Sequence, residues 1–243
     1  MMTYYILIST VLTICLVLML VDTSIKLAKS EHRTVSVVLI FGTICYVLFD
    51  LIWVLLYMAE DYRREPLVVM SVLFYLIYIT LPYIWFLFAH HFASNINKNR
   101  NWMMIASIPG FINLTLVILT ALGTDILWAI GDSENRYVRG PLFGVFANLN
   151  LVYYFIPVIE ILILMLRKPR KKNPLLLRTF GFSVIPALSV FIHTYIISVD
   201  AVIPFQPSCF FIGVMFAYTL LITTTYKETE EQNARLTERA LAA

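Results

Sequence analysis

The sequence predicts an all-α integral membrane protein built as a bundle of seven transmembrane helices. Hydrophobic residues make up 60% of its 243 residues and charged residues only 14%, a balance that a water-soluble core cannot absorb. A helix needs about 20 apolar residues to cross a bilayer, and seven stretches of roughly that length recur. They are residues 4 to 22, 35 to 58, 67 to 93, 102 to 122, 142 to 166, 175 to 199 and 205 to 226.

The first stretch, residues 4 to 22, is expected to remain in the protein as a span. Residues 1 to 22 contain no Lys or Arg, whereas a cleavable signal peptide begins with basic residues and ends at a small-residue cleavage site. The later stretches follow one another through short connections without Gly/Ser-rich or Pro-rich linkers. Residues 1 to 226 are therefore predicted to form one transmembrane domain, and residues 227 to 243 the start of a cytoplasmic linker.

The Lys and Arg residues are divided unequally between the two sides of the membrane. All but four of the 18 lie in the connections after the first, third and fifth spans and beyond the seventh. The side richer in Lys and Arg is normally cytoplasmic, which predicts an external N-terminus and a cytoplasmic C-terminus. The basic segment 167 to 178 is interpreted as a topology signal near anionic headgroups and not as a nucleic-acid site. The four basic residues on the external side are Arg63, Arg64, Arg136 and Arg139.

Polar and aromatic residues share one face of several spans. Ionisable groups inside a span are costly and usually face the bundle interior or a water-filled cavity, so Asp50 and His193 indicate a functional site. Helical spacing and span direction place these groups in the outer half of the membrane. We therefore expect an outward-facing pocket with Pro82 and Pro186 at its floor. The predicted ligand-binding residues are Tyr46, Asp50, Trp53, Tyr57, Tyr78, Asn148, Asn150, Tyr153 and His193.

Two interpretations of Asp50 stay open. It could pair with His193 as structural glue between helices. It could instead face a ligand, and an acidic group among aromatic rings would suit an amine or another cation, although a His193 partner would remove that preference. Four aromatic residues near span ends are interpreted as interfacial belt residues and left out of the site. These are Tyr4, Tyr5, Trp102 and Trp128.

A second polar layer is predicted in the inner half of the membrane. Glu160 of the fifth span lies at a depth near His90 and His91 of the third, which predicts a charge-paired signalling latch between these helices. Two alternatives remain. The histidines could lie at headgroup level without a special role, and Glu160 could extend its carboxylate to the interface.

Several functions of seven-helix proteins are excluded by the residues of the spans. No span contains the Lys that a retinal Schiff base needs. His90 and His193 differ in depth by roughly 22 Å at 1.5 Å per residue, too far apart to hold one haem. The adjacent His90 and His91 lack the spacing of a zinc hydrolase motif, and the three cysteines are interpreted as packing residues. We therefore predict no catalytic residues, no metal site and no cofactor.

The seventh span has no stop signal at its C-terminal end. Residues 227 to 243 contain no Gly or Pro, so the helix is expected to continue into the cytoplasm. Its heptad seam is typical of a two-stranded coiled coil and predicts a homodimer; the alternative is a frayed, solvated tail. The chain ends in mid-helix, so we expect a cytoplasmic domain to follow. The seam residues are Tyr226, Thr229, Asn233, Leu236, Ala240 and Ala243.

Short segments in residues 35 to 243 resemble the seven-transmembrane N-terminal sensor regions of bacterial histidine kinases and their diguanylate cyclase relatives. The resemblance implies the input half of a receptor, with a signalling helix leading toward a kinase core. The chain lacks a phospho-accepting histidine motif, an ATP-binding domain and a cyclase domain, so we expect no enzymatic activity from it alone. The segments are Phe49-Asp50-Leu51-Ile52-Trp53, residues 82 to 89, Pro141-Leu142-Phe143, Pro186 and residues 231 to 243.

Three functions are compatible with these patterns. The first is a sensor in the bacterial inner membrane, which binds a small ligand in the outer-half pocket and signals through the seventh helix to a dimeric kinase or cyclase. The second is a small-molecule transporter or channel, whose site would lie in broken helices at mid-membrane. The third is a structural anchor. The heptad continuation favours the sensor because a transporter has no obvious use for it.

Overall fold

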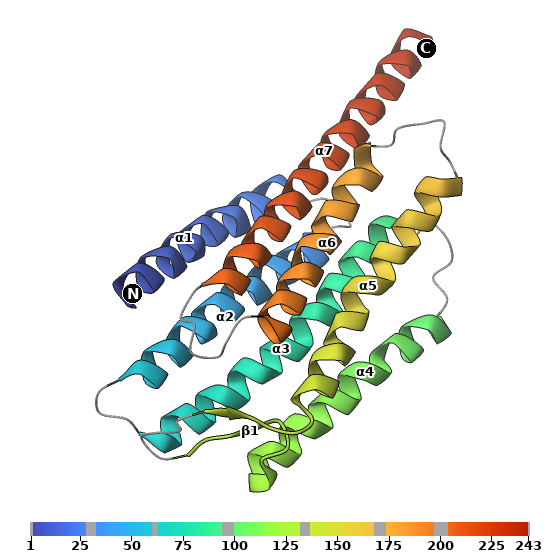
Figure 1. The fold of residues 1–243 in the computed structure, drawn as a ribbon. Helices are drawn as coiled ribbons and strands as arrows, with labels where there is room; N and C mark the ends of the chain where they lie inside the picture. Colours follow the sequence, from blue (N-terminus) through green and yellow to red (C-terminus); the bar gives the residue numbers. More distant parts are fainter. Residues whose placement is uncertain are drawn as a thin grey trace.

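The chain folds as an all-helical protein, as its composition predicts. The computed structural model describes residues 2–27, 33–59, 63–93, 100–131, 137–167, 174–196 and 204–242. Seven α-helices lie in these ranges and form one elongated bundle (Figure 1). The helices are α1 (Met2–Lys26), α2 (Arg33–Met58), α3 (Arg64–Ala93), α4 (Arg100–Leu119), α5 (Phe143–Arg167), α6 (Pro174–Tyr195) and α7 (Phe205–Ala242).

Five segments in the described ranges are long and apolar enough to cross a membrane. They belong to α1, α2, α3, α4 with the turn that follows it, and α7. Helices α5 and α6 contribute the shorter apolar segments Phe143–Ile159 and Phe180–Tyr195. These helices make the chain a multi-pass α-helical membrane protein.

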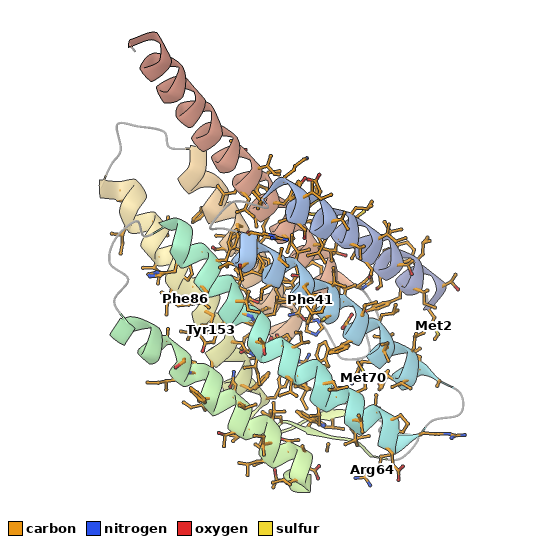
Figure 2. The ribbon with its side chains drawn as sticks, turned by 180° about the vertical axis from the view of Figure 1, so that it is seen from behind. Met2, Phe41, Arg64, Met70, Phe86 and Tyr153 are labelled. Atoms are coloured by element: carbon orange, nitrogen blue, oxygen red, sulfur yellow. The ribbon has the colours of Figure 1, made fainter. Side chains whose placement is uncertain are left out.

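Helix α3 occupies the middle of the bundle. It packs against α2, α4, α5 and α6, whereas α7 packs against α1, α2 and α6. Helix α1 therefore lies on one flank and α4 on the other, and the C-terminal part of α7 projects beyond the other helices (Figure 1). Side chains project from the outer surfaces of the helices as well as into the contacts between helices (Figure 2). Many large apolar side chains are exposed on the outer surfaces, as lipid-facing surfaces require.

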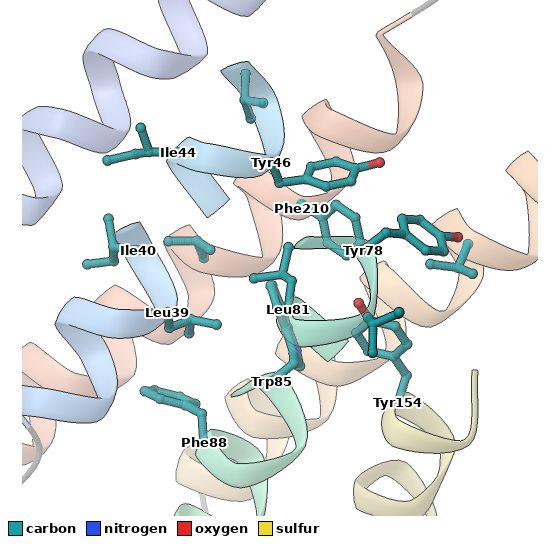
Figure 3. Close-up of a cluster of buried hydrophobic side chains, with 14 of the residues drawn as sticks. Leu39, Ile40, Ile44, Tyr46, Tyr78, Leu81, Trp85, Phe88, Tyr154 and Phe210 are labelled. Atoms are coloured by element: carbon teal, nitrogen blue, oxygen red, sulfur yellow. The ribbon is translucent and has the colours of Figure 1, made fainter. Parts of the chain in front are cut away.

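A layer of buried aromatic side chains joins α2, α3, α5, α6 and α7 (Figure 3). The Trp85 ring is fully buried and stacks on Phe182 with ring centroids 4.4 Å apart. The rings of Tyr46 and Phe210 meet edge to face at 4.9 Å, and Tyr154 completes the layer from α5. Close contacts among these rings fix the relative rotation of five helices.

Pro186 interrupts the backbone hydrogen bonding of α6, and a tryptophan from α3 compensates. A proline has no N–H to donate to the carbonyl four residues earlier, which in α6 belongs to Phe182. The Trp85 indole Nε1–H donates to this Phe182 carbonyl oxygen at 3.2 Å. The proline therefore acts in helix packing, because the carbonyl it leaves free binds α3 to α6.

The segment between α4 and α5 forms a short hairpin that the sequence did not indicate. Helix α4 ends in a π-helical turn (Thr120–Thr124), where Gly123 has φ +93°, a conformation that favours glycine. Strands β1 (Trp128–Ala129) and β2 (Val138–Arg139) then pair antiparallel. The hairpin lies across one end of the bundle (Figure 1), and this end is called the hairpin end below.

Helix α7 is one continuous helix of 38 residues. The prediction that the seventh helix continues past its span is therefore confirmed for the backbone. At 1.5 Å per residue α7 is about 57 Å long, well beyond the roughly 30 Å of a bilayer core. The side chains of the heptad seam lie outside the described side chains, so the seam itself stays a prediction.

Candidate functional site

A cavity of about 90 Å³ lies at the hairpin end of the bundle. Every α-helix except α4 contributes to its lining, together with residues that precede or belong to β2. Aromatic side chains form most of the wall, and the ionisable side chains at the wall include Asp50, Arg139 and His193. This combination of an apolar wall and a few polar groups is typical of a small-molecule site.

Asp50 of α2 has its partner on α1. The Tyr5 hydroxyl donates a hydrogen bond to the Asp50 carboxylate, and Tyr5 is 3% exposed. The assignment of Tyr5 to the interfacial belt is therefore wrong, because its side chain points into the bundle and lines the cavity. Among the described residues Asp50 has no ion pair with His193, so the expected pairing of these two groups is replaced by the tyrosine bond.

Trp53 and Tyr57 lie one and two turns along α2 from Asp50, on the same wall of the cavity. Their rings stack with centroids 5.1 Å apart and an interplanar angle of 9°. The Trp53 indole N–H donates to the Ser71 hydroxyl at 2.9 Å, which fixes the orientation of the ring. The helical spacing predicted that these three α2 residues share a face, and the structure places all three at the cavity.

The opposite wall comes from α3, with support from α7 and the hairpin. The hydroxyls of Tyr75 and Tyr137 form a hydrogen bond with each other, and Gln206 donates its side-chain N–H to the Tyr78 hydroxyl at 3.3 Å. Burial raises the pKa of Tyr137, which lies in the loop before β2, to about 12. Its hydroxyl therefore stays protonated at neutral pH and serves as a hydrogen-bonding group. Trp128, also assigned to the belt, is 3% exposed and stacks on Tyr75 at 4.3 Å.

Arg139 closes the side of the cavity formed by α5 and α6. Its guanidinium donates to the backbone carbonyls of Thr194 at 2.8 Å and His193 at 3.3 Å, and it lies 4.6 Å above the centre of the Phe143 ring. A cation at the last carbonyls of a helix is favourable. Arg139 thus satisfies the C-terminus of α6 and holds the hairpin against it.

Four of the nine predicted site residues lie away from the cavity. Asn150 is fully buried between α4 and α5, where its side-chain oxygen accepts from Asn113 at 3.0 Å. Asn148 is exposed and accepts from the Tyr195 hydroxyl at 2.7 Å. Tyr46 belongs to the buried aromatic layer. Tyr153 packs beside Phe86 (Figure 2), with its hydroxyl accepting from the Gly110 backbone N–H at 2.7 Å.

These departures have one physical cause. Helical spacing shows which residues of one helix share a face, but not which neighbouring helix that face meets. On α5 the predicted stripe turns toward α4 and α3, so Asn150 and Tyr153 make helix-packing hydrogen bonds there. Pro82 and Pro186, expected at the floor, do not line the cavity. For Pro186 the observed role is the α6 contact with Trp85.

The predicted inner latch is described only in part. The side chains of Glu160 and His91 lie outside the described residues. The ring of His90 stacks on Phe86, its neighbour four residues earlier, with centroids 5.6 Å apart. The latch between the third and fifth helices therefore stays a prediction.

Sequence reasoning missed nine residues at the cavity, and four of them are Tyr5, Tyr137, Arg139 and Gln206. Tyr5 carried no usable signal, because it lies at the very start of the first predicted span, whereas Asp50 lies eight residues inside the end of the second. The other three lie in or beside connections, where neither helical spacing nor span depth places a side chain. In the sequence, Arg139 was used only as one of the basic residues that indicate the orientation in the membrane.

The described residues include no group of three or more His, Cys, Asp or Glu side chains that could hold a metal ion. Comparisons of the chain with protein-family models, curated proteins and solved structures find no match. Its function is therefore inferred from its own residues and their geometry.

Proposed function

We propose that this chain is the transmembrane input module of a bacterial receptor. In this proposal seven spans place the N-terminus outside and the C-terminus in the cytoplasm of the inner membrane. A small extracellular or membrane-borne ligand binds in the cavity at the hairpin end. The seventh helix then transmits the change to a cytoplasmic histidine kinase or diguanylate cyclase that is joined to it.

The observation that carries the proposal is the continuity of α7. Gln206 and Pro207, in its first turn, line the cavity, and the same helix runs on to Ala242. Gln206 is 2% exposed and bonds Tyr78 on the opposite wall. A ligand that changes this contact would act directly on a rigid rod that leaves the membrane.

A second connection between the cavity and α7 runs through α1. The outer end of α1 is bonded to Asp50 by Tyr5, and Asp22 near its other end accepts a hydrogen bond from Tyr218 of α7. Lys26 also contacts Asp22 at 2.9 Å. Helix α1 therefore touches the cavity at one end and the output helix at the other.

The packed interior of the helix bundle gives less support to the transporter alternative. Beyond the cavity, deeper along α2 and α3, lies the buried aromatic layer of Tyr46, Trp85, Tyr154 and Phe210 (Figure 3). These side chains are fully buried or nearly so and contact one another. A transport path would have to open through this layer, whereas a sensor needs only a shift of the helices around it.

The proposed output is a parallel homodimer joined along the α7 seam. With the native cysteines replaced by alanine, single cysteines at 236 and 240 should crosslink between protomers in membranes, because identical seam residues oppose each other in a parallel pair. A cysteine at 238, off the seam, is the matched control. Efficient crosslinking at 238 alone would show that the tail does not pair along this seam.

The sensor function is tested by separating ligand response from transport. Compounds that raise the thermal unfolding midpoint of the wild-type chain, but not of Trp53→Ala, are selected as cavity ligands. The sensor predicts that such a ligand changes the distance between spin labels at 236 in the two protomers and does not cross liposomes faster when the protein is present. Protein-dependent flux with an unchanged label distance would overturn the proposal.

A further inference from the structure

We propose that the ligand of this cavity is an organic ammonium ion, that is, a protonated amine on a small apolar body. The inference rests on the proposed function, since it names the chemistry that the receptor recognises. It follows from the partners of Asp50, the engagement of Arg139 and the aromatic walls between them.

Asp50 is the acidic side chain of the cavity lining. A carboxylate has about four acceptor sites, and in the described part of the chain its hydrogen-bond partner is the Tyr5 hydroxyl alone. The ion pair of Asp22 with Lys26 lies at the other end of α1. Within a membrane-spanning bundle a carboxylate is stabilised by a counter-charge, and the residues that the structure describes place none against Asp50.

Arg139 also lines the cavity and could balance the charge of Asp50, but its guanidinium binds other groups. Its guanidinium faces the Thr194 and His193 carbonyls and the Phe143 ring, on the α5 and α6 side of the cavity. Asp50 is bonded toward α1. The two charges therefore bind different helices, and the cavity retains an acceptor on the α2 wall.

The wall around Asp50 suits the apolar body of an amine. The rings of Trp53 and Tyr57 lie along α2, and Phe74 and Tyr75 face them from α3. Aromatic faces attract cations and shield them from water. The volume of about 90 Å³ leaves room for several water molecules, enough for a compact aliphatic or single-ring amine.

The proposal is tested with three probes of matched shape on the full chain in lipid nanodiscs. They are phenethylamine, phenethyl alcohol and phenylacetate, and the readout is the thermal unfolding midpoint against probe concentration, with empty nanodiscs correcting for partition. The amine should stabilise the wild-type chain, whereas the alcohol and the carboxylate should not. Butylamine and cyclohexylamine, each with its alcohol, extend the test to other apolar bodies.

Two variants locate the binding group. Asp50→Asn should weaken amine binding about tenfold or more, because it removes a charge-assisted contact. The exposed Glu65→Gln is the matched control and should bind the amines like wild type. If Asp50→Asn does not fold, Tyr5→Phe provides the readout: the Tyr5 hydroxyl stabilises the charged form of the Asp50 carboxylate, so losing it should weaken amine binding at neutral pH.

Equal stabilisation by amine and alcohol would overturn the ammonium inference, as would amine binding that is unchanged in Asp50→Asn or unchanged in Tyr5→Phe. Failure of every amine to stabilise the chain would overturn it too. The two proposals fail separately: a neutral probe that binds wild type but not Trp53→Ala refutes the ammonium inference while leaving a ligand cavity, and with it the proposed function, in place.

Discussion

Gly213 shows how a single residue controls the packing of α7. A Cβ at this position would lie 2.7 Å from Trp85 Cζ2 and 3.1 Å from Pro186 Cγ. Both neighbours are rigid and the Trp85 ring is fully buried, so neither can move aside cheaply. Gly213→Ala should therefore lower the free energy of unfolding by about 1–3 kcal/mol, measured by thermal or denaturant unfolding in detergent.

Gly144 provides the control for this prediction. It lies in α5, and a Cβ there would meet nothing within 4 Å. Alanine is favoured over glycine within helices by roughly 0.5–1 kcal/mol, so Gly144→Ala should leave stability unchanged or raise it slightly. Equal effects of the two substitutions would mean that the contact of α7 with Trp85 is not tight.

Neighbouring tyrosines at the start of α1 show how residue roles depend on rotation. Tyr4 is 64% exposed, whereas Tyr5 is 3% exposed and bonds Asp50. Successive residues of a helix differ by about 100° around its axis, so one ring faces outward and the next faces α2. Their place near the end of the first span assigned both tyrosines to the membrane interface. Only the packing of α2 against Tyr5 distinguishes the two residues.

At the scale of elements, α1 is expected to be held to α7 by the hydrogen bond of Tyr218 to Asp22. Thr23, next to Asp22, is 1% exposed. With the native cysteines replaced by alanine, Thr23→Cys should be protected from maleimide, and Tyr218→Phe should speed its labelling because the helices separate more often. Asp22→Ala should act similarly, and the two together should add little, since each removes the hydrogen bond between Tyr218 and residue 22.

The exposed Tyr4→Phe is the control for this experiment and should not change the labelling rate of Thr23→Cys. Labelling that is equally slow with and without the Tyr218 hydroxyl would show that apolar packing alone holds α1 to α7. That result would remove the α1 connection from the proposed signalling route and leave the direct route through Gln206 of α7.

At the scale of the whole molecule, the distribution of basic residues predicts the orientation in the membrane. Reporter fusions after Arg170 and after Ala243 should be active as cytoplasmic reporters, and a fusion within residues 130 to 136 should be active as an external one. The control is to reverse the charge bias by adding Lys residues to the external loop, which should shift the population toward the opposite orientation. Opposite locations for the fusions after Arg170 and Ala243 would mean an odd number of crossings between them and would break the seven-span model.

The positions of the helices could be read from the sequence because the signals are local. Each apolar stretch and each cluster of Lys or Arg is a property of consecutive residues. The seven helices of the structure overlap the seven predicted stretches, although α4 ends at Leu119 and α6 at Tyr195, before the predicted ends at 122 and 199. The continuation of α7 beyond its span followed from the absence of Gly and Pro in residues 227 to 243. The face shared by Asp50, Trp53 and Tyr57 followed from helical periodicity alone.

The partners of these groups were decided only by the tertiary structure. Asp50 meets Tyr5 and not His193, Asn150 meets Asn113, and Arg139 reaches the cavity through a hairpin with no sequence signal. Such pairings depend on the rotation of one helix against another, which the buried rings around Trp85 determine. Periodicity specifies directions within a single helix, whereas a site is made where several helices meet, so its membership depends on packing between residues far apart in the chain.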